Sequence, residues 1–245
     1  MIDRLSVRER PTGFPILHQR WSRLAFLHFR VDADVLRPFV PGGLSLDRFD
    51  EETWVSVVVF TATRMRPSLF PPIPGLSTAH QINLRTYVYR DGIPGLWFFS
   101  LDATNALAVW AARVAYRLPY YRARIEVDET DNRVSFRSQR TDRKAKPALL
   151  RAEWEWGEPM PPAQPGTLEF FLVERYVLYS GTEARLLRAR IHHRPWPLRR
   201  ATITHLDSDI LTAQGLRTQD RAPLVQGQAQ PFDVSIWPPS RVRHS

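Results

Sequence analysis

Apolar and polar residues alternate with a period of two along several short segments of the chain. This spacing is typical of strands with one buried and one exposed face. The segment 54–60 is apolar and rich in valine, which predicts a central strand. The alternating segments are residues 121–127, 134–137 and 152–156, with weaker examples at 186–193 and 232–237. Short polar turns, such as residues 128–133, join these segments and therefore favour an antiparallel sheet.

A different pattern, in residues 103–117, predicts a helix. The segment holds neither glycine nor proline, and Asp102 before it can cap its first turn. Leu118 precedes Pro119, which disfavours helix at that point. Because the segment is apolar on almost every side, it is typical of a buried helix. The expected fold class is α+β, mainly β, with one buried helix at about 103–117.

The predicted strand at residues 81–89 carries its polar side chains on one face. Gln81, Asn83, Arg85, Tyr87 and Tyr89 share that face. If it looks into the interior of a closed sheet, it gives a pocket for a carboxylate or another polar small molecule, with Arg85 as a bidentate clamp. The alternative is that this face meets solvent or a neighbouring strand.

Two charged residues stand in strongly apolar segments. Arg113 lies in the middle of the predicted helix and needs a partner, which can be Asp102, Glu169, Glu174 or a bound anion. Glu174 shares a strand face with apolar residues, so burial is expected to raise its pKa. It then suits either a general acid or base or a buried pair with an arginine.

The histidines and the composition exclude several classes of site. His192 and His193 are adjacent, so on a strand they point to opposite faces and cannot chelate one metal ion together. No metal site and no cofactor are therefore expected. The chain has no cysteine, which excludes disulfides and thiolate chemistry.

The charge is strongly positive but is distributed along the whole chain. The formal net charge is +9, and 32 of the 34 basic residues are arginine because only Lys144 and Lys146 are lysine. Aspartate and glutamate are interleaved with the arginines, so nucleic-acid binding is not expected. No signal peptide and no membrane span are visible, which makes a cytoplasmic protein the default.

Several short stretches, taken in order, resemble one protein family. They include Trp21-Ser22-Arg23-Leu24-Ala25-Phe26, Val40-Pro41-Gly42-Gly43-Leu44, Asn83-Leu84-Arg85-Thr86-Tyr87, Phe98-Phe99-Ser100-Leu101-Asp102, Glu174-Arg175-Tyr176-Val177 and His193-Arg194-Pro195-Trp196. They are similar to the YqjF-like family of uncharacterised proteins over roughly residues 14–238. The resemblance implies a single acetoacetate-decarboxylase-like domain over 1–245: a mostly antiparallel β-barrel or cone with a buried helix and a central cavity.

The chain departs from the decarboxylase pattern at two positions. The decarboxylase forms a Schiff base through a lysine beside a second lysine, a case that is standard in the chemistry of activated amines. The resemblance aligns that site with Pro119-Tyr120-Tyr121, and a phenol cannot form an imine. Gln81 stands where these families tend to have glutamate, and an amide cannot exchange a proton as a carboxylate does.

These observations predict an uncharacterised protein with an internal small-molecule pocket for an anionic or carbonyl-containing ligand. The expected pocket residues are Gln81, Arg85, Tyr87, Arg113, Tyr120 and Glu174. Two alternatives stay open: a decarboxylase-like lyase that uses acid–base rather than imine chemistry, and a non-catalytic ligand-binding protein. The open edges of a sheet favour a homo-oligomer, although no residue selects one.

Overall fold

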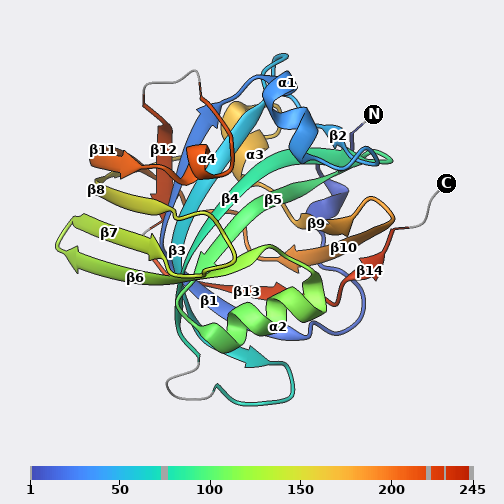
Figure 1. The fold of residues 1–245 in the computed structure, drawn as a ribbon, viewed down its shortest axis with the longest axis horizontal. Helices are drawn as coiled ribbons and strands as arrows, with labels where there is room; N and C mark the ends of the chain where they lie inside the picture. Colours follow the sequence, from blue (N-terminus) through green and yellow to red (C-terminus); the bar gives the residue numbers. More distant parts are fainter. Residues whose placement is uncertain (1, 73–76, 219–221, 229, 243–245) are drawn as a thin grey trace.

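The computed structural model describes residues 2–72, 77–218, 222–228 and 230–242, and in them the protein is mainly β (Figure 1). The helical elements are short. They are η1 (Ser6–Arg8), α1 (Ala33–Leu36), η2 (Arg37–Phe39), α2 (Ala106–Tyr116), α3 (Leu168–Val173) and α4 (Ile210–Ala213). The strands are β1 (Leu17–Arg30), β2 (Ser45–Leu46), β3 (Trp54–Pro67), β4 (Ala79–Arg90), β5 (Ile93–Ala103), β6 (Tyr120–Thr130), β7 (Arg133–Arg140), β8 (Leu149–Pro159), β9 (Val177–Thr182), β10 (Arg185–His192), β11 (Arg199–Ser208), β12 (Leu224–Gln228), β13 (Phe232–Ile236) and β14 (Ser240–Arg241).

The described strands form one sheet whose pairings close on themselves twice. One ring runs β1-β3-β4-β5-β9-β10-β13 and returns to β1. The second ring leaves β1 through β12, β11, β8, β7 and β6 and comes back through β5. Strand β5 pairs in parallel with β6 and β9, whereas the other pairings among the described strands are antiparallel. The antiparallel expectation therefore holds except at β5.

Because the two rings share β1, β3, β4 and β5, these strands have a core on each side. Val55, Val57 and Val59 of β3 belong to one apolar cluster, while Val58 and Phe60 belong to the other. A strand buried on both faces reads as a continuous apolar run. This explains the run at 54–60, which the sequence predicts to be a central strand.

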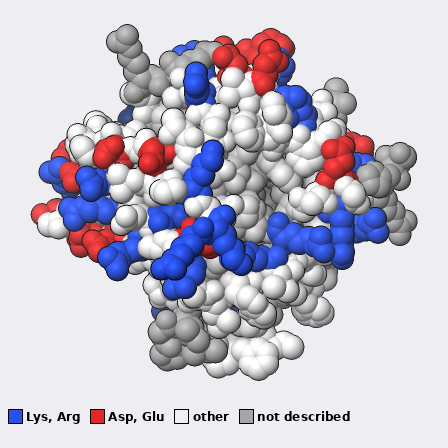
Figure 2. Space-filling model, viewed as in Figure 1, with Lys and Arg blue, Asp and Glu red and all other residues white. Residues whose placement is uncertain are grey.

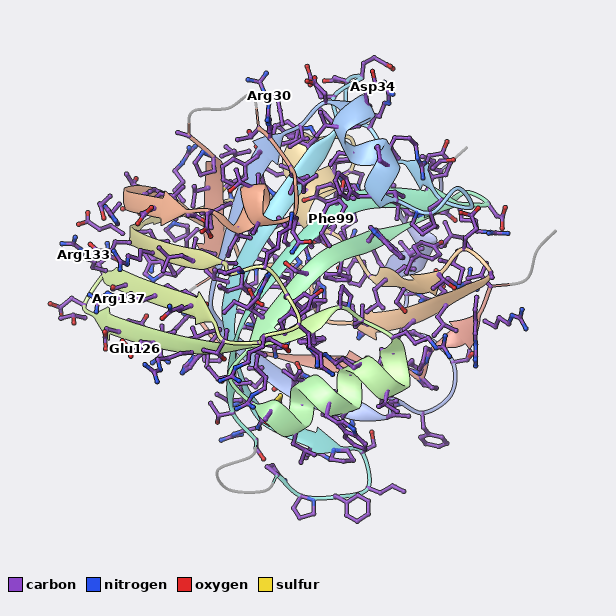
Figure 3. All side chains as sticks on the ribbon, in the orientation of Figure 1. Arg30, Asp34, Phe99, Glu126, Arg133 and Arg137 are labelled. Carbon is purple, nitrogen blue, oxygen red and sulfur yellow. The ribbon has the colours of Figure 1, made fainter. Side chains whose placement is uncertain are left out.

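The strands predicted from alternation are present and extend further than predicted. The segment 121–127 lies in β6 and 134–137 in β7, and their pairing continues to Thr130 and Arg133. Figure 3 shows the charged side chains Glu126, Arg133 and Arg137 at the outer end of this hairpin, and all three are exposed. Val134 and Phe136 on the opposite face are fully buried, so the period-two pattern identifies the core face correctly.

The predicted buried helix is wrong in two respects. Helix α2 covers Ala106–Tyr116 and is capped by Asn105, whose side chain accepts from the backbone N–H groups of Leu107 and Ala108. Asp102 instead ends β5, where it pairs with Arg140. The helix also lies on the outside of the sheet (Figure 1).

The large apolar side chains of α2 are exposed rather than buried. Leu107 is 53% exposed, Trp110 61% and Val114 62%. The all-round apolar character misleads because only Val109 of α2 is buried, while its other contacts with the ring are made largely by small alanine side chains. Those small side chains let the helix cover the ring without needing a second layer above it.

Candidate functional site

A cavity of about 430 Å³ lies inside the first ring and is covered by α2. Its wall is mostly apolar, with side chains from β1, β3, β4, β5, β9 and β10. Its polar wall residues include Gln81, Asn83, Arg85 and Tyr120. A mainly apolar hollow with a few converging polar groups is the usual form of a small-molecule site.

Strand β4 places three polar side chains in a row on this wall. Gln81, Asn83 and Arg85 alternate with Ile82 and Leu84, which face the other core. Successive members of the row are about 7 Å apart along the strand, because the side chains on one face repeat every two residues. The face that the sequence marks as polar therefore lies against the cavity and away from solvent.

Arg85 is the most unusual group on the wall. Its side chain is only 8% exposed, and its Nε and Nη2 atoms are buried without a hydrogen-bond partner. Among the residues that the structure describes, no carboxylate lies within ion-pair distance of it. The guanidinium lies 5.4 Å from the centre of the Phe26 ring. Burial lowers the pKa of Arg85, with a partial offset from Tyr87, yet arginine keeps its charge in proteins.

Gln81 and Tyr120 form a hydrogen-bonded pair on the same wall. The Tyr120 hydroxyl donates to Gln81 Oε1 at 2.9 Å. The chain reaches this point by leaving α2 through Arg117, which has left-handed backbone angles, before β6 starts beside β5. Burial raises the pKa of Tyr120 above its ordinary value, so the phenol remains a hydrogen-bond donor at neutral pH.

The α2 side of the cavity is made by alanines that sequence analysis did not single out. Ala108, Ala111, Ala112 and Ala115 all line it. Their spacing of three, one and three residues puts them on one helix face. A helix face made of alanines is visible in the sequence and indicates a cavity beside the helix. The small side chains leave open space that larger ones would fill.

Tyr87 and Glu174 do not line this cavity, which corrects their assignment to the pocket. The Tyr87 hydroxyl donates to the backbone carbonyl of Leu172 at 3.0 Å and also bonds Ser56. Glu174 accepts from the Tyr176 hydroxyl and from the Trp196 N–H at 3.2 Å. Both polar groups are satisfied inside the protein, which is the usual condition for burying them.

Arg113 does not line this cavity either. Its Nε donates to the carbonyl oxygen of Tyr120 at 2.6 Å, and its Nη2 pairs with Asp142. None of the three carboxylates expected as its partner, Asp102, Glu169 and Glu174, holds it. The reason is that α2 lies outside the sheet, where Arg113 reaches the loop after β7 and helps to fix the start of β6.

Two other buried arginines are paired with carboxylates. Arg140 makes two hydrogen bonds to Asp102, at 2.8 and 2.9 Å, and both side chains are almost fully buried. Arg175 donates to Asp47 at 2.7 Å and to the carbonyl of Phe171 at 2.7 Å. Both guanidinium groups therefore have a carboxylate partner, although Arg175 Nη2 is buried without a hydrogen-bond partner.

Two histidines are buried close to these groups. His28 bonds Ser56 at 2.6 Å, and burial holds its pKa well below the ordinary value. His193 packs against Tyr176 and Trp196, and burial lowers its pKa to about 4. Neither ring lines the cavity.

Both lysines lie on the exposed segment 141–147, and neither lines the cavity. Figure 2 shows lysine and arginine side chains in a band across the middle of one face, with a mostly uncharged surface below it. Within the described ranges, no three histidine, aspartate or glutamate side chains come together as a metal site would require. None of the helices in those ranges is long and apolar enough to cross a membrane.

The arrangement of strands matches that of acetoacetate-decarboxylase-like enzymes. The enduracididine biosynthesis enzyme MppR complexed with pyruvate superposes with a TM-score of 0.65 at 15% identity, covering 94% of this chain and 91% of that one. Acetoacetate decarboxylase from Legionella pneumophila subsp. pneumophila (strain Philadelphia 1) gives 0.59 at 11% identity, covering 96% and 92%. At these identities the likeness establishes the fold alone.

The sequence relatives define the family. The chain belongs to the DUF2071 family, described as an uncharacterized conserved protein, whose model matches residues 18–230. It is 35% identical over 228 residues to the uncharacterized protein YqjF of Bacillus subtilis (strain 168), covering 93% of each chain. The resemblance that the sequence motifs indicated is confirmed.

Proposed function

We propose that this protein binds a small anionic or carbonyl-containing molecule in the cavity of the first ring, which we take to be a cone-shaped barrel. The observation that carries the proposal is the guanidinium of Arg85, which lines the cavity, has no carboxylate partner among the described residues and leaves Nε and Nη2 without a hydrogen-bond partner. Leaving buried N–H donors unsatisfied costs about 1–3 kcal/mol for each group. Arg85 lines the cavity, so an anionic ligand that enters it would meet this cation and could accept hydrogen bonds from it.

Gln81 and Tyr120 would orient the ligand. The Tyr120 phenol stays protonated, so it can turn its hydrogen bond from Gln81 to a carbonyl oxygen of the ligand. Gln81 Oε1 would then lose a donor, which a hydroxyl group of the ligand or a water molecule would replace. Tyr87, Arg113 and Glu174 have no part in this binding site.

Imine chemistry is not part of the proposed function. The family resemblance aligns the lysine pair of acetoacetate decarboxylase with Tyr120-Tyr121, and both lysines of this chain are exposed. Incubation with pyruvate and borohydride should therefore leave the mass of the protein unchanged. A covalent adduct on Lys144 or Lys146 would overturn this part of the proposal.

Calorimetric titration with a panel of β-keto and 2-oxo acids tests the binding itself. We expect at least one acid to bind, and Arg85→Gln to weaken it by about tenfold or more, because a hydrogen bond to a charged group contributes about 1.5–3 kcal/mol. Arg113→Gln is the matched control, since Arg113 lies outside the cavity. Equal binding by wild type and Arg85→Gln would refute the assignment. Turnover of a bound acid would identify a lyase using acid–base chemistry, whereas binding without turnover supports a ligand-binding protein.

A further inference from the structure

We infer that the ligand of this cavity is an amphiphilic carboxylic acid whose carboxylate meets Arg85 and whose apolar body extends towards α2. This rests on the proposed function and adds the class of ligand to it. The shape and composition of the cavity carry the inference.

Arg85 and the α2 end of the cavity lie at different levels along the strands. Arg85 pairs across the sheet with Ser56 and Phe98, whereas Gln81 pairs with Ala103, just before α2. Four residues of strand span about 13 Å, so Arg85 lies about that far below the level at which α2 begins. At and between these levels the wall includes the apolar side chains of Val58, Phe60, Phe98 and Leu101, with Asn83 among them.

Besides Gln81 and Tyr120, the α2 end of the wall has apolar residues that reach the surface. Ile16, Pro67, Pro71 and Leu107 line the cavity and are exposed. A sugar acid or another uniformly polar molecule would leave its hydroxyl groups unsatisfied against this wall, at a cost in binding free energy. An alkyl or aryl body would instead bury apolar surface there.

Among the described residues, Arg66 is the one other cation on the cavity wall, and it lies at the opposite end from Arg85. It stands ten residues from Ser56 along β3, which corresponds to about 30 Å of extended strand. Its Nη1 already donates to the carbonyl of Ser68 at 3.2 Å. Arg66 is therefore a competing site for the carboxylate that mutagenesis can separate from Arg85.

The volume sets the size of the ligand. A cavity of about 430 Å³ has room for about fourteen atoms of water size, at about 30 Å³ each. A carboxylate group takes about three of these, which leaves room for about ten or eleven further carbon atoms.

Calorimetric titration of the full chain with linear alkanoates from acetate to dodecanoate tests the inference. We expect affinity to rise by about fourfold for each methylene, equivalent to about 0.8 kcal/mol, and to level off near ten to twelve carbons. Octan-1-ol should bind at least about tenfold more weakly than octanoate, because it lacks the charged oxygens. Arg85→Gln should remove the preference for octanoate, while Arg66→Gln leaves it unchanged.

A second pair of variants tests the direction of the apolar body. Ala112→Phe fills the α2 end of the cavity and should lower the chain length at which affinity levels off by several carbons, without changing butyrate binding. Val114→Phe adds the same side chain to the outer face of α2 and is the control. If Ala112→Phe loses the wild-type circular dichroism spectrum, Ala108→Phe makes the same test one turn earlier.

Each outcome separates this inference from the proposed function. If acids of all lengths bind equally, the amphiphilic ligand is refuted while the anion pocket stands. If Arg66→Gln abolishes binding and Arg85→Gln does not, the orientation is reversed and the inference fails. If no alkanoate or keto acid binds at all, the proposed function falls with it.

Discussion

Replacing Arg85 should make the unliganded protein more stable, whereas replacing Arg175 should make it less stable. Both guanidinium groups are buried, at 8% and 3% exposure. They differ in their partners: Arg175 donates to Asp47 and to the Phe171 carbonyl and has one buried nitrogen without an acceptor, while Arg85 has two such nitrogens and no carboxylate partner among the described residues. Methionine is the suitable replacement because it is flexible and of similar length.

The structure gives the size of each effect. Arg85→Met relieves two unsatisfied donors, at about 1–3 kcal/mol each, and loses the contact with the Phe26 ring, about 0.5–2 kcal/mol. The free energy of unfolding should therefore rise, by at most about 5.5 kcal/mol and by about 3 kcal/mol at the middle of both ranges. Arg175→Met leaves Asp47 with only Arg4 as its cation, and breaking a buried pair costs about 3–5 kcal/mol.

Urea unfolding, followed by tryptophan fluorescence, measures both changes. For a chain of this size, each kcal/mol also moves the melting temperature by about 2–4 °C, so the two variants should melt on opposite sides of wild type. Equal destabilisation by Arg85→Met and Arg175→Met would refute the reasoning, because it would show that Arg85 is satisfied in the unliganded protein. A bound acid should stabilise wild type but not Arg85→Met.

Three other predictions follow from buried polar groups. Asp102→Asn should lower the free energy of unfolding by about 3–5 kcal/mol, because it leaves the Arg140 charge buried and unpaired; a loss below 1 kcal/mol in urea unfolding would contradict this. The low pKa of His193 means that the unfolded state takes up a proton first as the pH falls. Stability should therefore be unaffected above about pH 6.5 and decline between about pH 6.5 and 4, by about 3 kcal/mol from this residue, and His193→Phe should flatten that slope in melts from pH 4 to 8. Tyr120→Phe should weaken binding of a keto acid by about three- to tenfold while the fold is retained, and unchanged affinity in titration calorimetry would remove Tyr120 from the site.

Sequence patterns predicted the strands well because alternation reports directly on which face is buried. The odd positions of residues 81–89 were identified as one polar face, and three of them, Gln81, Asn83 and Arg85, line the cavity. Tyr87 shares that face yet reaches a backbone carbonyl instead. Periodicity shows which face of the strand a side chain is on, but it does not show how far along the strand the cavity extends. It therefore could not predict that Arg85 lines the cavity and Tyr87 does not.

The errors at α2 have a different origin. Whether an apolar helix is buried depends on what lies above it, which no local pattern reports. The partner of Arg113 could not be predicted from the sequence either. Asp142 follows β7, and only the pairing of β5, β6 and β7 brings it close to the helix. Asp102 is predicted to cap the helix, but both of its carboxylate oxygens accept hydrogen bonds from the buried guanidinium of Arg140.

The two-ring architecture explains why the polar face of β4 indicates function. A strand shared by two cores is desolvated on both faces, so every polar side chain on it costs free energy unless it finds a partner. On the cavity face of β4, Gln81 bonds Tyr120, and Tyr87 bonds Leu172 and Ser56. Asn83 Oδ1 and two nitrogens of Arg85 have no hydrogen-bond partner. An aliphatic side chain at position 85 would fold more easily, so the cost of this arginine is best accounted for by an acidic ligand that completes its hydrogen bonds.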